Sequence, residues 1–207
     1  MKTVMIVGFG RRDVNSSSGR PSSGDEPPVT TDWAGSTHIG FSTERLVLTP
    51  LVPDDADKMV DVLADQALHE FIGGEPETLE GLRDRYRRLV AGSSRVDEVW
   101  LNWILRRRSD DEPVGTVQAT LVDDGGSWTA QVAWVVGAAW QHQGYASEAA
   151  RALVDWLQSH GVVSVLAHIH PDHQASAKVA DGAGLRPTSD EVDGERVWRA
   201  DTRTVSR

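Results

Sequence analysis

The segment AQVAWVVGAAWQHQGYASEAA, residues 130–150, decides the fold. An apolar, β-prone run at 132–136 is followed by a loop at 141–146 and then by apolar residues that recur at helical spacing. A loop that opens a helix leaves backbone N–H groups without acceptors at the positive end of the helix dipole. We therefore expect an anion site suited to a phosphate or pyrophosphate, where Gly144 lets the backbone come close to the ligand.

The flanking segments extend this strand–loop–helix unit into a sheet. Runs at 99–105 and 114–121 precede the central strand and are separated by turns rich in Asp and Gly, so we expect three antiparallel strands. The apolar run at 162–169 indicates a buried strand that the helix joins to the central strand by a right-handed parallel crossover. A short helix at 174–183 and a strand at 196–200 complete the pattern.

The preceding part of the chain predicts one strand and two helices. Residues 45–51 form the strand, and Pro53 opens the first helix with acidic residues in its first turn. Residues 68–74 break this helix, and Thr78 caps a second one that carries four interleaved arginines. We interpret these arginines as a solvated helix face, with contact to a phosphate as the alternative.

Residues 1–40 are interpreted as an N-terminal extension, disordered or loosely docked, because Ser, Gly and Pro dominate the stretch 15–28. The folded domain is predicted to span residues 41–203. The apolar start and the sequence Gly8-Phe9-Gly10 allow an alternative, a dinucleotide-binding unit, although no third glycine follows in place.

Composition excludes several classes of protein. The net charge of −10 argues against a non-specific nucleic-acid binder, which needs a basic face. The chain has no cysteine and therefore no disulfide or thiolate metal site. No apolar run reaches the length of a membrane span, so we expect a cytoplasmic protein with no membrane partner. We expect no metal either, because His168, His170 and His173 lack the helical i, i+4 spacing of a zinc pair.

The loop motif Q-x-x-G-x-A, formed by Gln141, Gly144 and Ala146, resembles the acetyl-CoA pyrophosphate loop of the GNAT superfamily of N-acetyltransferases. The longer string WQHQGYASEAA and the TERLVL string at 43–48 resemble the branch that acetylates ribosomal-protein N-termini. The resemblance implies an α+β (mixed α/β) GNAT fold, with a central, mostly antiparallel and splayed sheet of about six to seven strands flanked by helices.

The resemblance also implies a reaction and a set of binding residues. Acetyl-CoA is the implied co-substrate and passes its acetyl group directly to a primary amine, on a protein N-terminus or a small molecule; a homodimer is compatible with it. The segment 170–176 resembles the family's P-x-N-x-x-S motif, with His173 in place of the asparagine. The residues implied to hold acetyl-CoA are Trp134, Val135, Val136, Gln141, His142, Gln143, Gly144, Tyr145, Ala146, Ser147, His173 and Ser176. We expect Ser147 and Glu148 to cap the helix or to pair near its dipole.

The sequence offers several candidates for the proton acceptor. Relatives often carry an acid on the central strand where this chain has Gln131, and glutamine cannot accept a proton. The catalytic candidates are Gln131, His170 and Glu70, while His168 alternates with His170 on its strand and a water-mediated path is equally allowed. An α-amine has a pKa of about 8, against ~10.4 for lysine, so a site without a strong base favours α-amines.

Three functions remain open. The first is a GNAT N-acetyltransferase. The second is a non-catalytic acyl-CoA-binding GNAT-fold protein with a regulatory or interaction role, which Gln131 and His173 motivate. The third is a nucleotide-binding oxidoreductase built on Gly8-Phe9-Gly10.

Overall fold

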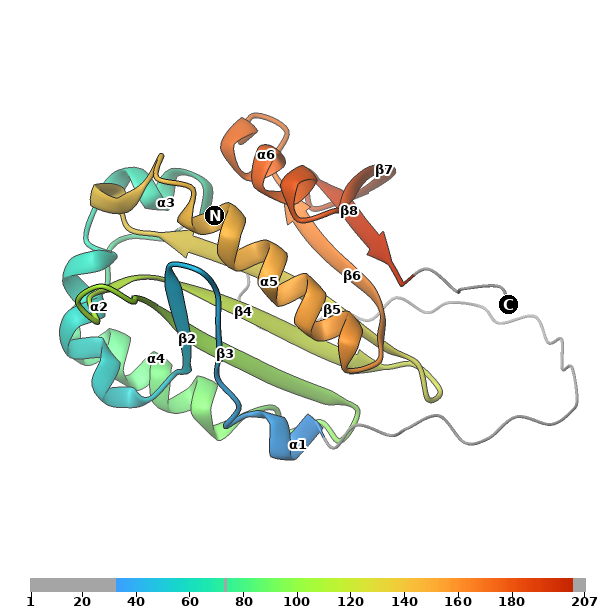
Figure 1. Ribbon diagram of the computed structural model, residues 1–207, viewed down its shortest axis with the longest axis horizontal. Coiled ribbons are helices and arrows are strands. Elements are labelled where there is room, and N and C mark those ends of the chain that lie inside the picture. Colours follow the sequence, from blue (N-terminus) through green and yellow to red (C-terminus); the bar gives the residue numbers. More distant parts are fainter. Residues whose placement is uncertain (1–32, 73, 203–207) are drawn as a thin grey trace, which may run out of the picture.

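A computed structural model describes residues 33–72 and 74–202 (Figure 1). Eight strands form one sheet in the order β1-β2-β3-β4-β5-β6-β8-β7. The strands are β1 (Phe41–Ser42), β2 (Leu46–Pro50), β3 (Glu98–Arg107), β4 (Pro113–Asp123), β5 (Trp128–Val136), β6 (Val162–Ile169), β7 (Arg186–Val192) and β8 (Glu195–Asp201). The helices are α1 (Trp33–Ser36), α2 (Ala56–Val62), α3 (Gln66–Ile72), α4 (Leu79–Ala91), α5 (Tyr145–Ser159) and α6 (Gln174–Gly182).

The predicted mixed, mostly antiparallel sheet is confirmed, and it is larger than expected. The two additional strands are β1 and β7. Strand β1 has only two residues, and β7 has the sequence RPTSDEV. Most side chains of β7 are exposed, so no apolar alternation marks it in the sequence. Its pairing with β8 stabilises it instead.

The strand–loop–helix unit forms as predicted. Helix α5 connects β5 to β6, and these two strands are parallel while all other neighbouring strands are antiparallel. The β5–β6 pairing runs only from Trp128 to Gln131 on β5 and ends at Leu166 on β6. Beyond that point β5 stays paired with β4 and β6 stays paired with β8, so the two strands diverge. The sheet is therefore splayed, and a wedge opens between β5 and β6 (Figure 1).

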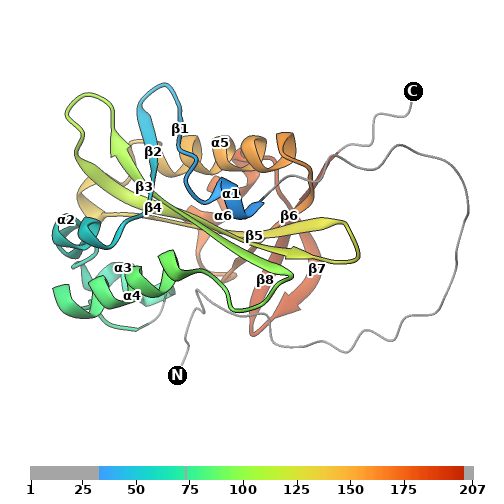
Figure 2. The same cartoon turned by 90° about the horizontal axis from the view of Figure 1, so that it is seen from below.

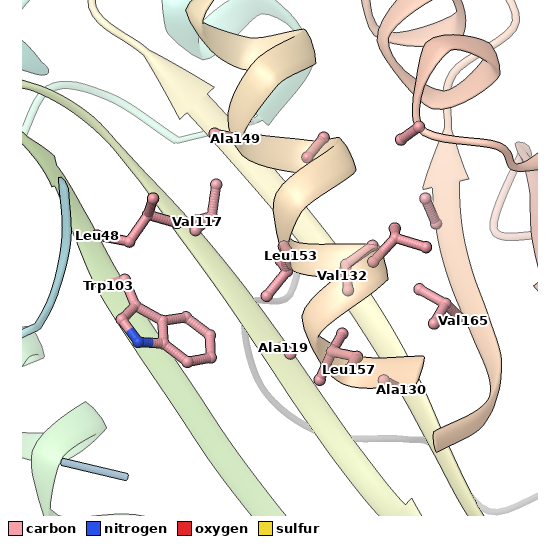
Figure 3. Packing of buried hydrophobic residues seen from close by; sticks show 14 of the residues in the cluster. Leu48, Trp103, Val117, Ala119, Ala130, Val132, Ala149, Leu153, Leu157 and Val165 are labelled. Atoms are coloured by element: carbon pink, nitrogen blue, oxygen red, sulfur yellow. The ribbon is translucent and has the colours of Figure 1, made fainter. Parts of the chain in front are cut away.

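The main core lies between the sheet and α5 (Figure 3). Ala149, Leu153 and Leu157 project from α5 onto the sheet and are each 0% exposed. Burying a leucine side chain stabilises a fold by about 1.5–3 kcal/mol, so this face fixes α5, and with it the loop that precedes α5, on the sheet.

A second core covers the opposite face of the sheet. Met59 of α2 and Leu82 and Leu89 of α4 pack there around Ile104 of β3. Figure 2 shows α5 on one face of the sheet and α3 and α4 on the other. The break expected at 68–74 is instead helix α3, a seven-residue segment too short to show a helical period in the sequence.

The segment before β1 is anchored through Trp33. Its side chain is 2% exposed, and its ring lies 6.2 Å from that of Trp128 and 5.9 Å from that of Trp156. Residues 1–32, including Gly8-Phe9-Gly10, lie outside the described residues. Across 33–72 and 74–202, no helix is long and apolar enough to cross a membrane.

Candidate active site

The loop before α5 exposes a row of backbone N–H groups. Gly144 is the residue before the helix and has a φ of +83°, and His142 has a φ of +59°. The first helical hydrogen bond runs from the Glu148 N–H to the Gly144 carbonyl, at 3.0 Å. Within the described part of the chain, the N–H groups of residues 142–147 have no backbone acceptor. Together with the helix dipole, they form the geometry expected of an anion site.

Arg45 adds a positive charge beside this loop. Its Nη1 donates to the Gln143 carbonyl at 2.8 Å, and its guanidinium carbon lies 4.9 Å from the centre of the Tyr145 ring. A Cβ built on Gly144 would lie 3.2 Å from Arg45 Nη2. Sequence reasoning missed this residue, because the contact joins segments 98 residues apart; the TERLVL string was the available signal.

Glu148 holds Arg45 in place, so of its two expected roles it takes the second and forms an ion pair in the first turn of α5. Its Oε1 accepts from Thr43 Oγ1 at 2.5 Å and from the Arg45 N–H at 2.8 Å, and its Oε2 pairs with Arg45 Nε at 2.7 Å. Burial alone would raise the pKa of Glu148, but the hydrogen bonds from Thr43 and Arg45 hold that pKa below its ordinary value. The carboxylate therefore stays charged and ties the turn between β1 and β2 to the first turn of α5.

Other side chains of the predicted loop support its shape. Gln141 Nε2 donates to the Val136 carbonyl at 3.2 Å, and Gln143 Nε2 donates to the Ala139 carbonyl at 3.3 Å. Tyr145 is 7% exposed, and Ala146 packs against the core. In these last two residues the backbone N–H, rather than the side chain, is the group available to a ligand.

The wedge between β5 and β6 leads away from this loop. Residues 132–136 of β5 have no strand partner on the β6 side within the described part of the chain. The backbone of Trp134, Val135 and Val136 can therefore pair with an extended ligand there. At about 3.3 Å per residue, the unpaired edge is ~16 Å long.

His173 and Ser176 lie after β6, on the far side of the open end of the wedge. The His173 ring centre lies 4.1 Å from that of Phe71 on α3, and the His170 ring lies 6.0 Å from Phe71. Burial and the neighbouring His170 lower the pKa of His173, against an opposing effect of Glu70. Ser176 is half-buried in the first turn of α6. Two of the catalytic candidates, Glu70 and His170, therefore gather around His173.

The third catalytic candidate, Gln131, lies where the wedge closes. Its Nε2 is 3.2 Å from Nδ1 of His168 on β6. The structure thus separates the candidates into Gln131 with His168 at the closed end, and Glu70 and His170 at the open end. Among the described residues, no cluster of three His, Asp or Glu side chains forms that suits a metal ion.

A cleft that is open to solvent lies between the sheet and helices α2 to α4. Its polar lining includes Asn102 and Gln118 of the sheet, and a salt bridge of 2.6 Å between Glu77 and Arg85. Arg85, one of the four arginines interpreted as a solvated helix face, therefore lines a cleft. Burial raises the pKa of Tyr86, which also lines it.

The comparisons with known proteins agree with this geometry. A family model described as an acetyltransferase (GNAT) domain matches residues 45–186. No curated protein sequence matches the chain.

Solved structures share the fold. A GNAT-family acetyltransferase from Bacillus anthracis superposes with a TM-score of 0.64 at 18% identity, over 79% of this chain and 98% of that one. The acetyltransferase from Agrobacterium tumefaciens has a TM-score of 0.61 and 22% identity, over 89% and 100% of the two chains. RimL, a ribosomal L7/L12 alpha-N-protein acetyltransferase in complex with coenzyme A, has a TM-score of 0.64 and 15% identity, over 77% and 95%.

Proposed function

The chain belongs to the GNAT acetyltransferase family, and we propose that it moves an acetyl group directly from acetyl-CoA to a primary amine. The observation that carries this proposal is the alignment of two features: the exposed N–H groups of residues 142–147 and the unpaired edge of β5. The first suits a pyrophosphate, and the second suits the extended, amide-containing arm that follows it. RimL, which shares the fold, binds coenzyme A.

Each group would have a defined role in this site. The loop N–H groups and Arg45 would hold the pyrophosphate, and the free edge of β5 would pair with the arm as an added strand. Acetyl-CoA supplies a thioester whose carbonyl carbon the amine attacks. A backbone N–H of the unpaired edge would stabilise the negative charge that develops on the carbonyl oxygen.

The cleft beneath helices α2 to α4 is the proposed entrance for the acceptor amine. It adjoins β5 through Val135, on the face opposite α5. Its walls mix apolar side chains with the Glu77–Arg85 pair, which suits an amine carried on a peptide or a small polar molecule.

Calorimetric titration with acetyl-CoA tests the cofactor site. Wild type is expected to bind with a Kd in the micromolar range, about −8 kcal/mol. In Gly144→Glu a carboxylate would occupy the pyrophosphate site, and binding should weaken at least tenfold. Gly184→Glu is the matched control, because Gly184 has a φ of +91° and a Cβ there would meet no atom within 4 Å. Absence of binding by wild type would refute the proposal.

Release of CoA thiol in the presence of an amine panel then tests turnover. Peptides with free N-termini, N-terminally blocked lysine peptides and polyamines separate the acceptor classes. Binding of acetyl-CoA without thiol release for any amine would favour the alternative, a non-catalytic acyl-CoA-binding protein, for which the replacement of an acid by Gln131 is the supporting observation.

A further inference from the structure

We infer that the side chains of Gln131 and His168 form a bridge across the closed end of the wedge, and that this bridge limits the acyl group of the bound thioester to acetyl. The inference rests on the proposed use of acetyl-CoA and adds which acyl donors the site accepts. The bridge is the contact of 3.2 Å between Gln131 Nε2 and His168 Nδ1.

The bridge joins the two strands just where they diverge. Backbone pairing between β5 and β6 ends at Gln131 and Leu166, and His168 lies two residues further along β6. At about 3.3 Å per residue, this places His168 ~7 Å into the wedge. Its contact with Gln131 therefore spans the gap that the diverging backbones leave open.

The bridge lies on the face of the sheet that carries the acceptor cleft. Ala130 and Val132 on β5, and Ala167 on β6, flank the two bridging residues and belong to the core beneath α5. Because side chains alternate along a strand, Gln131 and His168 both lie on the opposite face. The cleft beneath helices α2 to α4 lies on this same face.

A thioester held in the wedge would point at the bridge. The anion-binding loop lies at the open end of the wedge, directly after β5. An arm that starts at this loop and pairs with the unpaired edge at 132–136 runs along β5 toward Gln131. The acyl group at the tip of the arm is therefore expected next to the bridge, and each added CH2 group extends it in that direction.

The size and polarity of the bridge favour the shortest acyl group. Gln131 and His168 are both half-buried, and they satisfy each other's polar groups. A longer apolar chain would displace the two side chains or bury their amide and imidazole groups against CH2 groups, and both outcomes cost free energy. An acetyl group ends in a single methyl and needs the least space.

The test compares acetyl-, propionyl-, butyryl- and succinyl-CoA as donors in wild type, Gln131→Ala and His168→Ala. Wild type is expected to prefer acetyl-CoA over propionyl-CoA by about 10–200-fold in kcat/KM. Each variant removes one side of the bridge, so this ratio should fall at least about tenfold. The ratio is unaffected by a loss of activity that is common to all donors, and turnover of the longer esters establishes that the variants fold.

Ser164→Ala is the matched control. Ser164 lies on the same face of β6 as His168, but in the paired part of the strand, opposite Thr129, and its Oγ donates to Asp201. This variant should keep the wild-type ratio. An unchanged ratio in both bridge variants, or an equal change in Ser164→Ala, would overturn the inference while the acetyltransferase proposal stands.

Calorimetry with the same four esters separates the inference from the proposed function. If wild type binds acetyl-CoA without turnover, the ratios of Kd for the four esters decide the inference by the same criteria. A wild type that prefers succinyl-CoA to acetyl-CoA, or that binds none of the four esters, would overturn both the inference and the proposed function.

Discussion

Replacing Glu148 by alanine is expected to destabilise the protein and to loosen the loop that precedes α5. The carboxylate accepts hydrogen bonds from Thr43 Oγ1 at 2.5 Å and from the Arg45 N–H at 2.8 Å, and its side chain is 17% exposed. Two such hydrogen bonds contribute about 1 kcal/mol each. The ion pair with Arg45, whose side chain is 44% exposed, adds about 0.2–1 kcal/mol after solvent screening. The free energy of unfolding should therefore fall by about 2–3 kcal/mol.

Urea unfolding at pH 7 measures this loss, and thermal unfolding should show a decrease in Tm of about 4–12 °C. Glu80→Ala is the matched control, because Glu80 also lies in the first turn of a helix and shares the dipole interaction. Its side chain is exposed, and in the described part of the chain it makes no ion pair comparable to that of Glu148. We expect the control to lose less than about 1 kcal/mol.

The pH dependence gives a second readout. The pKa of Glu148 is lower in the folded protein than in the unfolded chain. Its stabilising effect is therefore fully present above the unfolded pKa of about 4.3 and is lost as the pH falls through the folded value. The difference in stability between wild type and Glu148→Ala should shrink below pH ~4. Equal losses in the Glu148 and Glu80 variants, or a difference that acid leaves unchanged, would refute this reasoning.

Three further predictions concern the two cores. Trp33→Ala should lower the free energy of unfolding by about 3–5 kcal/mol in urea, because the ring is 2% exposed, and a loss below about 1 kcal/mol would contradict its anchoring role. Asp55→Asn should cost about 3–5 kcal/mol by calorimetry, because it removes the buried negative charge that pairs with Arg106, whose Nη2 lies 2.5 Å from Asp55 Oδ1 and whose side chain is 18% exposed. Tyr86→Phe should not destabilise the protein at neutral pH, since the buried hydroxyl has no partner among the described residues. Burial raises the Tyr86 pKa, so wild type should lose stability above pH ~10 as the unfolded tyrosine ionises, and the variant should lose less in alkaline urea titrations.

The part of the fold that local pattern determines was predictable from the sequence. The apolar run of β5, the glycine loop and the apolar face of α5 each lie within one short segment of the sequence, and their order is as predicted. Strand β7 was not predictable, because the polar sequence around Pro187 becomes a strand only through pairing with β8. Tertiary pairing of this kind overrides local preference.

The same distinction applies to the candidate site. The loop is local, so Gly144 and its neighbours could be identified from the motif. Arg45 and Glu148 meet across 103 residues, and Gln131 and His168 meet across 37, so both pairs depend on how the strands are placed. Strand register is set by the whole sheet and by which of its faces is buried. It therefore cannot be predicted from the sequence of either paired segment alone.

The short stretch of pairing between β5 and β6 has a consequence for the lifetime of the protein. The two halves of the sheet share backbone hydrogen bonds only from Trp128 to Gln131 on β5, so the outer part of β6 is joined to the rest chiefly through α5. A ligand that fills the wedge would add a strand-like bridge between the halves and would stabilise the folded state in proportion to its concentration above Kd. Resistance to proteolysis would then rise and fall with acetyl-CoA, and the abundance of the protein would follow the metabolic state of its surroundings.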